Sequence, residues 1–195
     1  DALVIAEAVH NNGGIVMMQV QKMVKKATLH PKAVRIPGYL VDIVVVDPAQ
    51  TQLYGGAPVN RFISGDFTLD DSERVKIPLN QRKVVARRAL YEGAIGNVGV
   101  GIADGIGLVA REEGCDEDFV LTVETGPIGG ITTQGVAFGA NVNTRAILDM
   151  TAQFDFYHGG GLDVCYLSFA EVDQHGNVNV HKFNGKIMGT GGFID

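Results

Sequence analysis

Cysteine is scarce in this sequence of 195 residues, and it contains no long apolar run. The two cysteines, Cys115 and Cys165, are too few for a disulfide scaffold and predict a reducing, cytoplasmic location. No apolar run approaches the roughly 18 residues of a membrane span, so we expect no association with a membrane. The absences leave a thiol-poor globular protein as the starting hypothesis.

Positive charge and metal-ligand patterns are also sparse. Lys and Arg number 16 against 22 Asp and Glu, for a net charge of −6, and the densest basic cluster, residues 22–26, has three lysines and no aromatic residue. We interpret it as a solvated face and expect no nucleic acid partner. None of the histidines has a metal-binding spacing such as His-Glu-x-x-His, so we predict no metal; they are His10, His30, His158, His175 and His181.

Glycine, by contrast, is abundant, with 26 residues, nearly twice its usual share of about 7%. Because 46% of residues are hydrophobic, only six are proline and no three-residue glycine period occurs, collagen-like and disordered chains are excluded. Many glycines gather in three loops, at residues 96–105, 126–130 and 159–161. Loops without side chains let the backbone approach a ligand closely.

Apolar spacing that alternates between helical and extended periods predicts an α/β fold. Five prolines punctuate residues 31–79, which we interpret as a connector. Asn80 is the expected N-cap of one helix and Gly114 the C-cap of another. Helices are expected over residues 2–9, 81–91, 106–113 and 144–154, and strands over residues 15–20, 41–46, 94–101, 119–123, 162–171 and 178–182, with a turn at 174–177.

One carboxylate, Glu124, has an unusual setting. It follows the mostly apolar run 119–123 and precedes the glycine loop 126–130. In open α/β sheets, ligands bind beyond the carboxyl ends of the strands. A partly desolvated carboxylate at such a place suits proton transfer or nucleophilic attack. The alternative is a structural carboxylate that caps nearby amides, and composition does not separate the two.

The segment LTVETGPIGG, residues 121–130, resembles the active-site glutamate motif of the family I coenzyme A transferases, in the propionate, acetate and acetoacetate branch. Residues 86–105, with NVGVGI at 97–102, resemble the opening of that family's β-type half. GGGLDV at 159–164, together with residues 170–180, is similar to its downstream strand and hairpin. Residues 36–42 resemble the connector between the family's two halves, so the resemblance covers essentially the whole chain in order.

The resemblance implies an open, mostly parallel sheet with flanking helices, the fold of the family's β-type half, truncated at both ends. Residues 1–30 then correspond to the tail of the α-type half, 31–79 to the connector, and 80–195 to an incomplete β-type catalytic half. The α-type half of the parent chain is therefore an expected partner, and the parent is expected to form a homo-oligomer. The same reading leaves open whether the fragment alone is active.

The resemblance also implies a reaction, the transfer of coenzyme A between a short-chain acyl-CoA and a carboxylate through a glutamyl-CoA thioester. Coenzyme A is then a substrate and no cofactor is expected. Motif position assigns the nucleophile to Glu124, and oxyanion N–H donors to Val100 and to Gly160 or Gly161; the alternative for these loops is glycine required by turns alone. The expected contacts with CoA are Gly96, Asn97, Val98, Gly99, Val100 and Lys182. For Lys182, which could meet a CoA phosphate, a solvated hairpin lysine is the simpler interpretation.

Three alternatives remain from the sequence. Gly99-x-Gly101 with Gly105 lies between a strand and a helix, and Glu124 follows at roughly the 20-residue distance of a ribose-binding acid, as in NAD-binding oxidoreductases. The third glycine is one residue late for that pattern, which also leaves two glycine loops unexplained. An acyl-CoA hydrolase on the same scaffold and a non-catalytic CoA-binding or assembly module are the other two.

Overall fold

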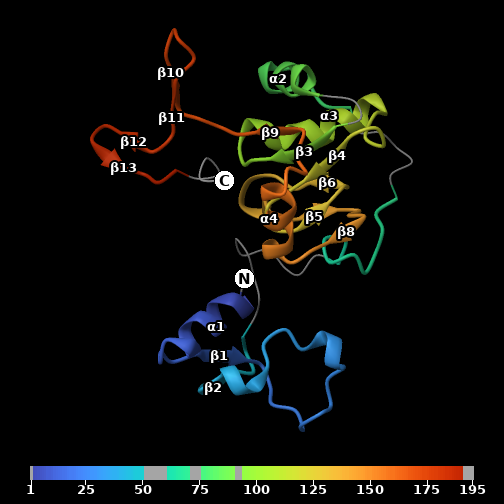
Figure 1. Cartoon of the computed structure of the whole chain (residues 1–195). Helices are drawn as coiled ribbons and strands as arrows, with labels where there is room; N and C mark the ends of the chain where they lie inside the picture. Colours follow the sequence, from blue (N-terminus) through green and yellow to red (C-terminus); the bar gives the residue numbers. More distant parts are fainter. Residues whose placement is uncertain (1, 51–60, 71–75, 91–93, 191–195) are drawn as a thin grey trace. The chain divides into compact units, whose positions relative to one another are not determined.

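The computed structural model describes residues 2–50, 61–70, 76–90 and 94–190. The chain divides into two compact units, Asp1–Leu53 and Tyr54–Asp195. The first is coloured blue to cyan in Figure 1. None of the helices in the described ranges is long and apolar enough to cross a membrane.

The first unit joins a helix to a pair of parallel strands. Helix α1 (Ala2–Asn11) runs two residues beyond the predicted span and ends at the Asn-Asn-Gly-Gly segment, where the Gly14 N–H donates to the Val9 carbonyl at 2.9 Å. Strands β1 (Met17–Val20) and β2 (Ile43–Val46) pair in parallel. Between them lie the 3-10 helices η1 (Pro31–Ala33) and η2 (Gly38–Leu40). The division of these residues between an α-type tail and a connector stays a prediction, and residues 51–60 and 71–75 of that connector lie outside the described residues.

The second unit is built on a five-stranded sheet in the order β8-β5-β4-β3-β9. Strand β3 lies between β4 and β9 and is parallel to both, whereas β4–β5 and β5–β8 are antiparallel. The sheet is therefore mixed, and the expectation of a mostly parallel sheet is wrong for its β4–β5–β8 half. The strands are β3 (Ile95–Val98), β4 (Val120–Thr122), β5 (Pro127–Ile128), β8 (Ala146–Ile147) and β9 (Val164–Tyr166).

The antiparallel half arises where the sequence predicted irregular structure or helix. After β4 the chain turns back at once, so Pro127–Ile128 inside the second glycine loop forms β5. Ala146–Ile147 then pairs with β5 as β8, and α4 is Met150–His158 rather than 144–154. The helix begins late because Asp149 is still extended, with φ −69° and ψ 143°.

The remaining strands form short antiparallel pairs. The expected strand over 162–171 is divided into β9 and β10 (Glu171–Val172), and β10 pairs with β11 (Val178–Asn179). The predicted turn at 174–177 is confirmed, because the Asp173 Oδ1 accepts the N–H groups of His175 and Asn177 at 2.8 and 2.9 Å. Two further pairs are β6 (Ile131–Thr132) with β7 (Asn141–Val142), and β12 (Lys182–Phe183) with β13 (Lys186–Ile187); a 3-10 helix, η4 (Gly135–Ala137), lies between β6 and β7.

Helices α2 (Gln81–Ala89) and α3 (Ile106–Glu113) enclose the main apolar core against one face of β3 and β4. Both predicted caps are confirmed: the Asn80 Oδ1 accepts the Lys83 N–H at 2.9 Å, and Gly114 is left-handed at φ 73°. Residue 91, the predicted end of α2, lies outside the described residues. A 3-10 turn, η3 (Ile102–Gly105), leads into α3. The core consists of Ala86, Ala94, Val98, Ala103, Ile106, Val109, Phe119 and Leu121.

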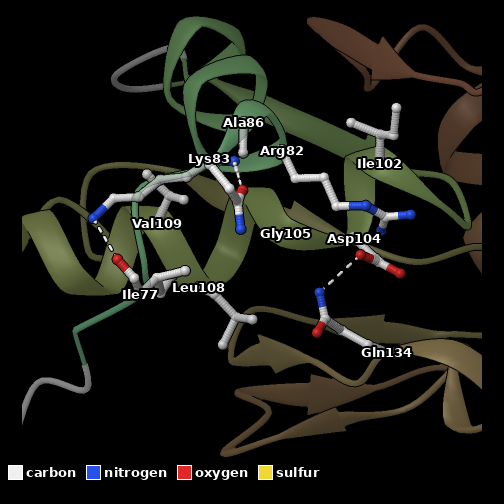
Figure 2. Close-up of a pocket in the computed structure, with 11 residues that line it drawn as sticks. Ile77, Arg82, Lys83, Ala86, Ile102, Asp104, Gly105, Leu108, Val109 and Gln134 are labelled. Carbon is white, nitrogen blue, oxygen red and sulfur yellow. Dashed lines mark hydrogen bonds between the residues drawn. The ribbon is translucent and has the colours of Figure 1, made fainter.

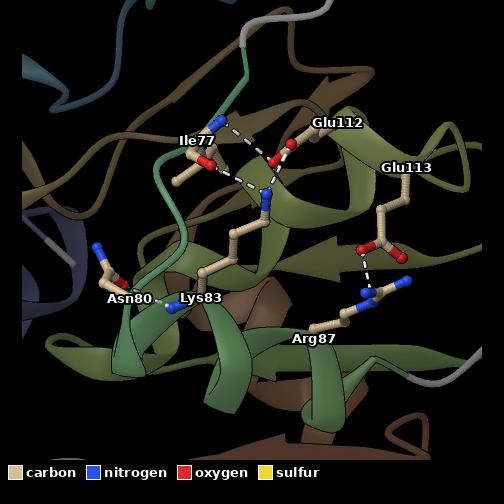
Figure 3. Close-up of polar contacts among 6 residues, drawn as sticks. All are labelled: Ile77, Asn80, Lys83, Arg87, Glu112 and Glu113. Atoms are coloured by element: carbon tan, nitrogen blue, oxygen red, sulfur yellow. Dashed lines mark hydrogen bonds and ion pairs between the residues drawn. The ribbon is translucent and has the colours of Figure 1, made fainter.

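A largely buried ion pair joins α2 to α3 (Figure 3). The Lys83 Nζ donates to the Glu112 Oε1 at 2.6 Å and to the Ile77 carbonyl at 2.9 Å, while the Ile77 N–H donates to the Glu112 Oε2 at 3.2 Å. The hydrogen bond from Lys83, followed by that from Ile77, holds the pKa of Glu112 below its ordinary value. The pair therefore fixes the segment before α2 to the end of α3.

Candidate active site

Three parallel strands, β4, β3 and β9, end at the same edge of the sheet. Asn97 lies opposite Thr122 on β4 and opposite Cys165 on β9. Two residues beyond this level, β3 has become the glycine loop at Gly99 and β4 has become the turn that carries Glu124. The structure thus brings the predicted nucleophile and the first glycine loop to one edge, which is where ligands bind in open α/β sheets.

Glu124 lies half-buried in a tight turn between β4 and β5. The Gly126 N–H donates to the Val123 carbonyl at 2.9 Å, and the Val123 N–H donates to the Pro127 carbonyl at 3.1 Å. Gly126 has φ +119°, and a Cβ there would lie 2.0 Å from the Leu148 carbonyl oxygen, so this turn requires glycine. Within the described ranges no group hydrogen-bonds to the Glu124 carboxylate, so the capping alternative finds no partner there.

The first glycine loop is held against β9. The Gly99 N–H donates to the Tyr166 carbonyl at 2.8 Å, and the Ser168 hydroxyl donates to the Val100 carbonyl at 2.8 Å. A Cβ on Gly99 would lie 2.9 Å from the Tyr166 carbonyl oxygen. Val100 itself is 57% exposed. Two contacts therefore fix the backbone of the loop while its outer surface stays open.

The other residues predicted to contact CoA from this segment lie deeper. Gly96, Asn97 and Val98 lie in β3 and are buried, with Val98 fully enclosed in the core. The side chain of Asn97 is engaged with Tyr157 on α4. Of the predicted segment, only Gly99 and Val100 reach the surface of the edge that carries Glu124.

Gly160 and Gly161 lie at the opposite edge of the sheet. They precede Asp163, whose N–H donates to the carbonyl of Ile95 at 2.9 Å, at the start of β3. Their own N–H groups donate to the carbonyls of Tyr157 and Phe156, each at 3.0 Å, and so complete the end of α4. The structure does not bring these N–H groups to Glu124, and their role as oxyanion donors stays a prediction.

Lys182 lies in the β12–β13 hairpin and is exposed. Its backbone N–H donates to the Asn179 Oδ1 at 3.4 Å, and its carbonyl accepts from the Asn179 Nδ2 at 2.7 Å. The exposure of Lys182 fits the interpretation of a hairpin lysine that reaches solvent. A contact with a CoA phosphate remains a prediction.

A polar layer beneath this edge was missed by the sequence reasoning. The Tyr157 hydroxyl of α4 donates to the Thr122 Oγ1 at 2.8 Å and accepts from the Asn97 Nδ2 at 3.0 Å and the Gln153 Nε2 at 2.9 Å. The available signal was the pair of polar residues, Asn97 and Thr122, each in an otherwise apolar strand directly before a candidate loop. Because the predicted helix ended at residue 154, three residues before Tyr157, nothing indicated their partner.

A separate pocket opens on the α2–α3 side of the sheet (Figure 2). Its polar residues include Arg82 and the buried Asp104, whose Oδ1 accepts from the Gln134 Nε2 at 2.9 Å. Glu124 is not among the residues that line it. In the part of the chain that the structure describes, no group of three or more His, Cys, Asp or Glu side chains is placed to hold a metal ion.

The sequence matches no protein-family model, but individual relatives place it clearly. The chain belongs to family I of the CoA-transferases. It is 89% identical over 198 residues to the acetate CoA-transferase YdiF of Escherichia coli K12, a match that covers 100% of this chain and 37% of that protein. The chain therefore spans little more than a third of the length of this relative.

Solved structures agree with this assignment. A crystal structure of the acyl-CoA transferase YdiF apoenzyme from Escherichia coli O157:H7 is 84% identical, with a TM-score of 0.85 over 100% of this chain and 36% of that one. A second structure of that protein, described as a thioester complex with CoA, has a TM-score of 0.83 and 84% identity over 98% of this chain and 37% of the other. The α/β fold described above thus matches part of the fold of a known CoA-transferase.

Proposed function

We propose that this chain carries the nucleophile of a CoA-transferase that moves coenzyme A between a short-chain acyl-CoA and a carboxylate, and that the nucleophile is Glu124. The observation that carries the proposal is the position of Glu124, half-buried in a glycine-supported turn beside the Gly99–Val100 loop. The relative that forms a thioester complex with CoA supports it.

The reaction proceeds by two displacements on each half-cycle. The Glu124 carboxylate attacks the thioester carbonyl, which forms a mixed anhydride and releases the CoA thiolate. The thiolate then attacks the glutamyl carbonyl, forms a glutamyl-CoA thioester and releases the first carboxylate. An incoming carboxylate reverses both displacements and leaves as the new acyl-CoA, so the free energy of the thioester is retained in covalent bonds rather than lost to hydrolysis.

The setting of Glu124 favours such a nucleophile. A carboxylate that is partly removed from water and bonded to no neighbouring donor keeps its lone pairs available for attack. Each displacement creates an oxyanion, and backbone N–H groups stabilise such charge, with one donor typically worth about 100- to 1000-fold in rate. The proposed donor is the N–H of Val100, in the loop that Ser168 and Tyr166 hold in place.

The test uses the full-length enzyme that contains these residues. After incubation with acetyl-CoA, borohydride or hydroxylamine is added and the modified peptide is located by mass. We expect modification at Glu124 and loss of transfer by at least about 1000-fold in Glu124→Gln, as expected for loss of a covalent nucleophile. Glu117→Gln is the matched control, because the Glu117 side chain is 83% exposed and bonds to Arg145. Turnover with an unmodified Glu124 would refute the proposal.

The same preparation separates the other candidate functions. A hydrolase releases CoA without an acceptor carboxylate, whereas a transferase requires one for turnover. A CoA-binding module binds CoA and forms no covalent adduct. NAD binding, measured by calorimetry, would favour the oxidoreductase.

A further inference from the structure

The hydroxyl of Tyr157 uses its full hydrogen-bonding capacity beneath the candidate site. A tyrosine hydroxyl has one proton to donate and two lone pairs to accept. It donates to the Thr122 Oγ1 at 2.8 Å and accepts from the Asn97 Nδ2 at 3.0 Å and the Gln153 Nε2 at 2.9 Å. One oxygen atom of α4 is therefore hydrogen-bonded to side chains of both β3 and β4.

The bonds continue across the sheet from this junction. The Thr122 Oγ1 donates to the Gly96 carbonyl at 3.0 Å, which joins β4 to β3 through a side chain. The Cys165 Sγ donates to the Asn97 Oδ1 at 3.5 Å, which adds β9. All three strands are thus connected at one level, two residues before Gly99 and Glu124.

This arrangement carries a free-energy cost that apolar packing would avoid. Gln153 is fully buried, and its Oε1 has no partner among the described residues while its Nε2 is committed to Tyr157. A buried polar atom without a partner is unfavourable. On the other face of the same strands, apolar side chains alone pack against the helices. We therefore interpret the polar junction as setting the relative placement of the strands rather than adding buried apolar area.

We infer that Tyr157 is a positioning residue, which fixes the Glu124 turn relative to the Gly99–Val100 loop; the inference rests on the proposed function. Tyr157 does not contact the reacting atoms in this role. Its hydroxyl sets the alignment of β3 with β4, and the two loops follow directly from those strands. Loss of the hydroxyl lets the nucleophile and the oxyanion donor shift relative to each other, and a misplacement of about 1 Å can cost about 100-fold in rate.

The test compares Tyr157→Phe with the parent enzyme in the full-length chain. We expect the rate of glutamyl-CoA thioester formation, followed by quenched-flow mass spectrometry, to fall about 10- to 100-fold. The KM for acetyl-CoA should change by less than about threefold, because binding contacts are left in place. Thr122→Val removes the same junction from the opposite side and should show the same loss, whereas Thr122→Ser keeps a hydroxyl and should retain activity.

A stability control separates positioning from general loosening of the fold. Val109→Ala opens a cavity in the α2–α3 core, at a side chain 1% exposed, and should lower the Tm while the rate of thioester formation stays within about twofold of the parent. The inference would be overturned if Tyr157→Phe formed the thioester as fast as the parent enzyme. It would also be overturned if Val109→Ala, at a Tm equal to that of Tyr157→Phe, lost as much of the rate. If Tyr157→Phe does not fold, the contrast of Thr122→Val with Thr122→Ser decides.

Glu124→Gln is measured in parallel so that the two proposals fail separately. An active Glu124→Gln enzyme removes the proposed function itself. An inactive Glu124→Gln enzyme together with an unimpaired Tyr157→Phe enzyme overturns only the positioning role.

Discussion

The two faces of β3 and β4 stabilise the same strands by different means. Toward α2 and α3, the strands present Val98 and Leu121, which are 0% and 3% exposed and join the apolar core. Toward α4, the neighbouring residues Asn97 and Thr122 are equally buried but form directional hydrogen bonds with Tyr157. Because successive side chains of β3 and β4 point to opposite faces of the sheet, the apolar core lies on one face and the polar junction on the other.

The difference indicates that the two faces of the sheet have different roles. Apolar packing is roughly proportional to the area buried and tolerates changes that keep volume. Hydrogen bonds depend on distance and angle, so a polar face specifies the relative placement of the strands more narrowly. We therefore expect the α2–α3 face to control stability and the α4 face to control alignment at the edge with Glu124.

The largest loss of stability should come from the apolar face. Leu121→Ala leaves a cavity beside α3 and should lower the free energy of unfolding by about 2–5 kcal/mol. Urea unfolding followed by circular dichroism measures the change. Leu121→Met, which conserves volume, should cost less than about 1.5 kcal/mol. A comparable loss in both variants would contradict the idea that burial dominates on this face.

The next effect tests the polar face. Thr122→Val keeps the shape but removes the acceptor for the Tyr157 hydroxyl proton and the side-chain donor to the Gly96 carbonyl, so it should cost about 1–3 kcal/mol. Because Tyr157→Phe breaks the same junction, the double variant should be less destabilised than the two single losses added together. Strict additivity in urea unfolding would show that the two side chains do not act as one unit.

A smaller effect probes the tolerance of the apolar face. Ile106→Val removes one methylene from a side chain that is 1% exposed, and should cost about 0.5–1.5 kcal/mol. Val84→Ala on α2, where the side chain is 56% exposed, should stay within about 0.5 kcal/mol of the parent. The difference between them, from thermal unfolding, gives the contribution of burial on this side of the sheet.

The smallest effect concerns polar contact outside the sheet, between α2 and α3. The pKa of Glu112 is lowered mainly by Lys83, so its stabilisation is complete above the ordinary glutamate value of about 4.3 and is lost as pH falls through the lower folded value. Lys83→Met should therefore flatten the fall of stability below about pH 4.3. Arg145→Met, at the exposed pair with Glu117, should leave that slope unchanged when urea unfolding is repeated across pH.

Sequence reasoning succeeded where the determinants are local. The bounds of α3, the N-cap Asn80 and the C-cap Gly114 are encoded within a few residues, and the structure confirms them. The family was also recognised, because the segment that resembles its glutamate motif is contiguous in sequence.

The features that local patterns did not reveal depend on pairing between distant residues. Ala146–Ile147 form a strand because β5 offers them an edge, which outweighs local helical spacing. The opposite placement of Gly160–Gly161 depends on the parallel pairing of β9 with β3. Tyr157 meets Asn97 across 60 residues of sequence, a distance that no local pattern spans.

The strand order also implies a sequence of folding events. Thr122 and Gly96, which join β4 to β3, are 26 residues apart, whereas Cys165 and Asn97, which join β9 to β3, are 68 apart. Because closing a longer loop costs more entropy, the β3–α3–β4 unit should form before α4 and β9 dock. The nascent chain would then hold β4, the strand that leads to Glu124, in its apolar setting before Tyr157 docks, so the polar junction and the alignment that it gives to the proposed site would form last.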